Sequence, residues 1–128
     1  NPVYGGDRSC LVTVRDALDL CDAIGAANVG VAVDVYHVWW DPDLARQMLR
    51  ARGRIAGFHV CDWKVPTVDT VFDRGMPGEG VIDIPAIRAM AEAAGWTGGV
   101  EVEILSNRWW AEDPEAVMQA VKASHAFC

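Results

Sequence analysis

The stretch "VAVDVYHVWWDPDLARQMLRARGRIAGFHVCDW", residues 31–63, begins and ends with short apolar runs rich in β-branched and aromatic residues. Such runs are typical of strands. Between them, Asp41 and Pro42 are typical of a helix start and Gly53 of a helix end, so a helix is predicted over 41–53. A strand, a helix and a second strand of this size predict a βαβ unit with two parallel strands.

The same order continues on both sides of this unit. Thr13 is a suitable helix cap and Gly25 a suitable stop, with an apolar stripe between them. The connection over 64–80 is rich in Pro and Gly and is expected to be irregular. The remaining predicted elements are a helix over 83–95, a strand over 98–105 and a helix over 113–127. The pattern predicts an α/β fold with a parallel sheet.

Composition limits the classes of function. The 128 residues are 52% hydrophobic, and 18 acidic residues against 11 basic ones give a formal charge of −7. This balance argues against nucleic-acid and anionic-membrane partners and favours a small molecule. The sequence shows neither a signal peptide nor a membrane-spanning run. Its four cysteines lack metal-type spacing and are expected to be reduced thiols of a cytoplasmic protein.

Polar side chains occur near the carboxyl ends of all three predicted strands. Asp34, His59 and Glu103 fall on the strand face that carries small or polar residues, whereas branched apolar residues occupy the other face. Parallel α/β enzymes build their sites at this end of the sheet. Taken singly, Asp34 could be a cap and His59 a core residue. Together they predict a site for a divalent cation such as Mn²⁺, Mg²⁺, Co²⁺ or Zn²⁺.

His37 follows Asp34 by three residues, in a segment expected to be a loop. It is better placed to hydrogen-bond a substrate hydroxyl than to share the cation, although a surface histidine with no such role is the alternative.

Four motifs, "DVYHVWWDPDL", "GFHVCDW", "DRGMPGEG" and "VEVEI", occur in this order. The sequence resembles the sugar phosphate isomerase/epimerase group of the xylose isomerase-like TIM barrels over nearly its whole length. The resemblance implies a (β/α)8 barrel in which a divalent metal is held by two glutamates, an aspartate and a histidine. It also implies that sugars or polyols are isomerised or epimerised by proton transfer next to a carbonyl.

Carried over position by position, the resemblance assigns the metal to Asp34, His59 and Glu103, with Glu103 also acting as acid or base. It implies that His37 and Arg74 bind the carbohydrate substrate. Glu101 shares the face of Glu103 but lies deeper along the strand, so a structural role is expected for it.

The departure from the family pattern is as informative as the match. The family's first glutamate ends a strand that would precede Asn1, and only three of eight barrel strands are predicted here. Residues 1–128 are therefore expected to be the C-terminal part of a single barrel domain. The rest of the barrel, or a second copy of the chain, would cover its apolar surface. Two alternatives stay open, namely a metal-dependent endonuclease-like hydrolase of the same superfamily and a non-catalytic barrel fragment.

Overall fold

A parallel sheet of three strands lies at the centre of the structure, a computed structural model that describes residues 1–6 and 8–128. The strands are β1 (Val31–Asp34), β2 (Ile55–Val60) and β3 (Glu101–Val102), in that order across the sheet. Asp34 is the register partner of His59, and His59 is the partner of Glu101. This register brings the polar carboxyl ends of all three strands to one edge of the sheet.

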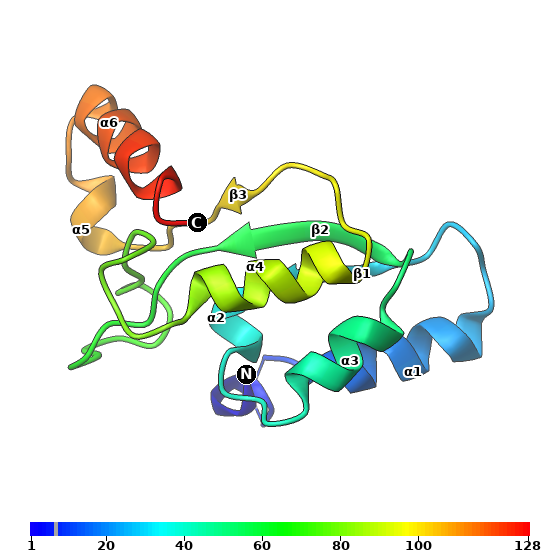
Figure 1. The fold of residues 1–128 in the computed structure, drawn as a ribbon. Helices are drawn as coiled ribbons and strands as arrows, with labels where there is room; N and C mark the ends of the chain where they lie inside the picture. Colours follow the sequence, from blue (N-terminus) through cyan, green and yellow to red (C-terminus); the bar gives the residue numbers. More distant parts are fainter. Residues whose placement is uncertain (7) are drawn as a thin grey trace.

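Helices cover one face of the sheet (Figure 1). They are α1 (Val14–Ile24), α3 (Leu44–Arg50) and α4 (Ile84–Ala93), with α3 contacting both of the others. Side chains of alternate strand residues pack against these helices and form the core, as the predicted alternation requires. The strand residues buried there are Val31, Val33, Phe58 and Val60.

The predicted limits of α1 are confirmed. Thr13 and Asp16 form a capping box, in which each side chain accepts a hydrogen bond from the backbone of the other. Gly25 ends the helix at φ 67°, a left-handed conformation that favours glycine. The helix therefore presents its buried stripe, Val14, Leu18 and Cys21, in a fixed position against the sheet.

The helix expected over 41–53 is shorter than predicted. The carboxylate of Asp41 accepts a hydrogen bond from the backbone N–H of Asp43 (2.8 Å), which makes a turn of the residues around Pro42. Regular α3 then starts at Leu44 and ends at Arg50, and Gly53 lies in the turn that enters β2. The Asp-Pro pair at 41–42 thus forms a turn before the helix instead of its first turn.

The carboxyl ends of the strands also depart from prediction. Val35 starts a one-turn helix, α2 (Val35–Val38), because Asp34 caps it through the N–H of Tyr36, so His37 lies on a helix and not in a loop. The strand expected over 98–105 is reduced to the two residues of β3, with Glu103 directly after it. The N–H of Glu103 still bonds to Val60 O (3.0 Å), so Glu103 stays attached to β2.

The remaining elements lie at the two ends of the chain. The helix α6 (Pro114–His125) starts after Asp113 as predicted. Two short helices were not predicted, η1 (Pro2–Tyr4) and α5 (Asn107–Trp110). In the part of the chain that the structure describes, none of the helices is long and apolar enough to cross a membrane.

Candidate functional site

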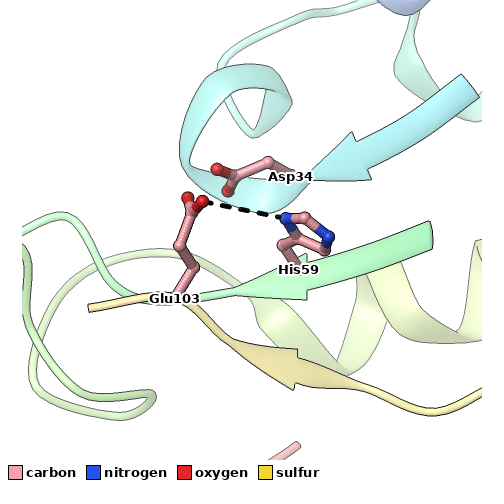
Figure 2. A group of neighbouring side chains, drawn as sticks. All are labelled: Asp34, His59 and Glu103. Carbon is pink, nitrogen blue, oxygen red and sulfur yellow. Dashed lines mark ion pairs between the residues drawn. The ribbon is translucent and has the colours of Figure 1, made fainter. Parts of the chain in front are cut away.

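Three side chains meet at the carboxyl edge of the sheet. Figure 2 shows Asp34 from the end of β1, His59 from β2 and Glu103 from just after β3, with their polar atoms directed toward one another. One ligand atom from each lies within 4.8 Å of the others, and His59 Nδ1 is 4.0 Å from Glu103 Oε1. Two carboxylates and one imidazole at this spacing fit a divalent cation.

Arg74 reaches the same point from the connection between β2 and α4. Its Nη1 donates to Glu103 Oε2 (2.7 Å) and to Asp34 Oδ2 (3.3 Å), and its side chain is only 5% exposed. The guanidinium therefore partly neutralises the two carboxylates, which would otherwise repel each other in a poorly hydrated environment. The sequence placed Arg74 near the substrate, and the structure adds that it touches two of the predicted ligands.

The connection that carries Arg74 is fixed to the ends of β2 and β3. The backbones of Asp62 and Gly75 exchange two hydrogen bonds (2.8 and 2.9 Å), and the N–H of Arg74 donates to Leu105 O (3.2 Å). The buried carboxylate of Asp62 accepts three further bonds from backbone N–H groups of Trp63, Gly78 and Ile82. Glycine is required at Gly80, because a Cβ there would collide with Trp63 O and with the Asp62 carboxylate.

Burial and the neighbouring carboxylate change the protonation of Asp34. Its side chain is 12% exposed, and burial raises its pKa from 3.8 to about 6, with a further contribution from Glu103 that the charge of Arg74 opposes. Burial also acts to raise the pKa of Glu103, but the hydrogen bond with Asp34 and the charge of Arg74 outweigh it and lower this pKa. The two acids therefore ionise unequally, and a bound cation would favour ionisation of both.

His37 lies beside this group on α2. Its Nε2 is 3.5 Å from Asp34 Oδ2 and 3.4 Å from Arg74 Nη2, and its ring meets the rings of Tyr4 and Tyr36 edge to face. Burial, reinforced by the charge of Arg74, lowers the pKa of His37 from 6.5 to about 4. The imidazole is therefore neutral at physiological pH and can form hydrogen bonds without adding charge.

Glu101 lies on the same sheet face, one position deeper than Glu103. Its Oε2 is 3.8 Å from His59 Nε2, on the opposite side of the imidazole from Glu103, and its side chain is 74% exposed. Such exposure makes this an ion pair of small energetic value in this structure. Because its side chain is largely exposed, Glu101 does not pack in the core. The structural role expected for Glu101 therefore depends on its contact with His59.

A cavity of about 420 Å³ opens next to the site, on the side of β1 away from β2. Asp34, His37 and Arg74 border it, and residues of α1 and of the segment before it, both apolar and polar, form most of the remaining wall. This volume lies within the range of small-molecule sites.

Known proteins share this arrangement of strands and helices. Residues 2–124 match the family described as xylose isomerase-like TIM barrel. The chain belongs to this family. The predicted fold class is thereby confirmed, and the open three-stranded sheet is a section of the eight-stranded barrel that defines xylose isomerase-like proteins.

Individual members of the family match as well. An inosose isomerase from Bacillus velezensis is 27% identical over 123 residues, covering 93% of this chain and 44% of the relative. A crystal structure of a protein from Sinorhizobium meliloti 1021 is 48% identical with a TM-score of 0.95, covering 100% of this chain and 47% of that one. The IolI protein with a bound zinc atom is 22% identical with a TM-score of 0.81, over 94% of this chain and 44% of that one, and supports the fold. The chain thus spans less than half the length of the relatives that it matches.

Sequence reasoning missed Tyr36, whose ring lies against Arg74, and Asp62, which holds the connection that carries Arg74. Tyr36 lies between two predicted site residues, Asp34 and His37, and its buried position after an apolar strand gave it the pattern of an ordinary core residue. Asp62 follows two buried residues and had no partner visible in the sequence. Only the folded connection shows the three backbone N–H groups that surround its carboxylate.

Proposed function

We propose that the protein is a divalent-metal-dependent isomerase or epimerase of a sugar or polyol. The observation that carries this proposal is the convergence of Asp34, His59 and Glu103, with Arg74, at the carboxyl edge of adjacent parallel strands. The similarity to inosose isomerases supports the reaction class. Residues 1–128 would contribute three strands to a single barrel domain.

Asp34, His59 and Glu103 are the residues that would hold the cation. The donor set suits Mn²⁺, Mg²⁺, Co²⁺ or Zn²⁺, and the zinc of the IolI protein agrees with it. The raised pKa of Asp34 also fits, because a cation would compensate for the ionised carboxylate that burial disfavours. When bound, the cation would polarise a carbonyl oxygen and so make the adjacent C–H more acidic.

Glu103 is the proposed acid and base at that carbon. It is 42% exposed, more than Asp34, and directs its carboxylate to the open sheet face where a substrate would lie. Its lowered pKa keeps it ionised and ready to accept a proton at neutral pH. Returning the proton on the opposite face of the carbon requires a second group. A carboxylate elsewhere in the barrel would supply it.

The charges near the site favour an uncharged carbohydrate over a sugar phosphate. Arg74 is already matched by two carboxylates, and other cations of this edge are paired too, Lys64 with Asp73 (2.5 Å) and Arg108 with Glu79 (3.2 Å). Neutral His37 and the guanidinium of Arg74, which both border the cavity, would instead hydrogen-bond the hydroxyl and carbonyl oxygens of the substrate and orient them.

Solvent deuterium exchange tests the proposal. Full-length protein with Mn²⁺ should introduce deuterium next to the carbonyl of an inosose or ketose, and Glu103→Gln should reduce this exchange at least about 100-fold. Glu112→Gln, an exposed acid outside the site, is the matched control and should exchange like the wild type. Failure of the wild-type protein to exchange any inosose or ketose with any of the four cations would overturn the proposed function.

A further inference from the structure

Tyr36 occupies the space beneath the group of charged side chains. It is 1% exposed, its backbone N–H donates to Asp34 Oδ1 (2.9 Å), and its hydroxyl donates to Thr70 O (3.0 Å). The Cζ atom of Arg74 lies 4.5 Å from the centre of its ring. Trp63 packs against the ring at 4.8 Å and limits its movement.

The polar contacts of Arg74 constrain its guanidinium incompletely. Both carboxylate contacts, to Asp34 and Glu103, are made by the same nitrogen, Nη1, and the buried Nε has no hydrogen-bond partner. Nη2 adds one longer contact, to His37 Nε2 (3.4 Å), so the group keeps some freedom to tilt about Nη1. The Tyr36 ring, lying against the face of the guanidinium, removes this freedom through a cation–π contact that is strengthened by exclusion of water.

We propose that Tyr36 is a positioning residue that fixes the plane of the Arg74 guanidinium. Its ring supports the guanidinium, and its hydroxyl holds Thr70, four residues before Arg74 in the same connection. The inference rests on the proposed function in so far as Arg74 orients the substrate. The contact itself can be measured without any substrate.

Tyr4 provides a matched control within the chain. Its hydroxyl donates to the same carbonyl, Thr70 O, and its ring lies at 5.3 Å from the His37 ring, compared with 5.7 Å for Tyr36. Both tyrosines are buried. Within residues 1–6 and 8–128, however, the ring that lies against the Arg74 guanidinium is that of Tyr36 and not that of Tyr4, so replacing each tyrosine in turn separates ring support from general packing.

Nuclear magnetic resonance of the metal-free full-length protein tests the contact. The Nε–H signal of Arg74, identified by its loss in Arg74→Lys, should be shifted upfield by the ring current in the wild type and in Tyr36→Phe. Tyr36→Leu should abolish the shift, whereas Tyr4→Leu should keep it. An unshifted wild-type signal, or an equal shift in Tyr36→Leu, would overturn the inference whether or not the protein is an isomerase.

Kinetics then measure the consequence for the reaction. Tyr36→Phe keeps the ring, and Tyr4 still donates to Thr70 O, so kcat/KM should fall by no more than about threefold. Tyr36→Leu should lower kcat/KM about tenfold, mainly through kcat. Pentafluorophenylalanine at position 36 preserves ring size but reverses the charge of the ring face, which guards against a Leu variant that fails to fold. It should lower kcat/KM as Leu does. Activity equal to Tyr36→Phe in the fluorinated variant would contradict the ring-support role.

Discussion

Arg74 and Glu103, 29 residues apart in the chain, meet at 2.7 Å at the open edge of the sheet. Arg74 comes from an irregular connection and Glu103 from the segment after the shortest strand, so neither position is set by a long regular element. Hydrogen bonds from this connection to Asp62 and Leu105 bring the two together. The site is therefore built as much by loop hydrogen bonds as by strand register, and variants in either part should affect it.

Removing a proposed ligand should abolish cation binding and activity together. Asp34→Asn and His59→Ala in the full-length protein are each expected to weaken Mn²⁺ or Zn²⁺ binding by at least about 100-fold, because each removes one of the three donors that residues 1–128 contribute. Isothermal titration calorimetry measures this directly, with Glu112→Gln as a control that should bind like the wild type. Unchanged affinity in both ligand variants would remove the assignment.

Arg74→Ala should separate cation binding from turnover. Loss of the guanidinium removes a positive charge 3.3 Å or less from two proposed ligands, so the affinity for a divalent cation should be retained or increased. Turnover should fall by roughly 100-fold, because the substrate oxygens lose an orienting donor. Calorimetry and exchange kinetics on the same preparation give both values. Loss of cation binding would mean that Arg74 supports the ligands themselves.

His37→Ala should also keep the cation and lose turnover, but with little change in cation affinity. His37 is neutral at physiological pH because its pKa is lowered to about 4, so its removal changes no charge at the site. An expected loss of about 10- to 100-fold in kcat/KM would reflect lost hydrogen bonding to the substrate. A variant with full activity would show that His37 is a surface residue without a role in binding.

The stability of the metal-free protein should depend on Asp34 in a definite pH range. The folded-state pKa of about 6 lies above the usual 3.8, so folding favours the protonated acid. Its stabilising contribution is present below about pH 4 and is lost as the pH rises through about 6. Asn at this position does not titrate, so the stability of Asp34→Asn relative to wild type should increase by about 2 kcal/mol between pH 4 and pH 7.

Urea unfolding at several pH values measures this difference. His37, whose lowered pKa makes it destabilising as the pH falls from 6.5 toward 4, is present in both proteins, so its contribution cancels. The attraction of Arg74 for ionised Asp34 is already included in the folded-state pKa of Asp34, so it adds no separate contribution to this difference. A stability difference that is constant from pH 4 to pH 7 would show that burial of Asp34 does not perturb its ionisation.

The sequence was sufficient where local rules decide structure. The Thr13 cap and Gly25 stop of α1, the alternation along β1 and β2, and the positions of Asp34 and His59 on one face all follow from local pattern. The short β3 and the turn at Asp41 could not be predicted in this way. A strand at the margin of a sheet needs a partner to extend it, and an aspartate side chain can cap a turn as readily as a helix.

The site was predicted from recurrence and resemblance, and its electrostatics were not. Three polar residues at strand ends indicated that a group would form, and the family resemblance indicated His37 and Arg74. Contact between Arg74 and Asp34 spans 40 residues and depends on the path of an irregular connection, which no periodicity describes. The support of Arg74 by Tyr36 depends on the same path.

Residues 1–128 expressed alone should be inactive, whereas the full-length protein should be active. In this structure the sheet face that carries the site is open, and Glu101 and Glu103 are 74% and 42% exposed. Water at an open face weakens each electrostatic contribution to catalysis, and within residues 1–6 and 8–128 Glu103 is the one group proposed to exchange a proton. Epimerisation needs a second group on the opposite face of the carbon.

Deuterium incorporation by both proteins, with Mn²⁺ and the same inosose and ketose panel, measures the difference. Exchange by residues 1–128 at a rate near that of the full-length protein would show that Glu103 alone removes the proton at an open face. Inversion at that carbon by the short chain would show that Glu101 or water serves as the partner of Glu103, and Glu101→Gln in the short chain would then distinguish these two.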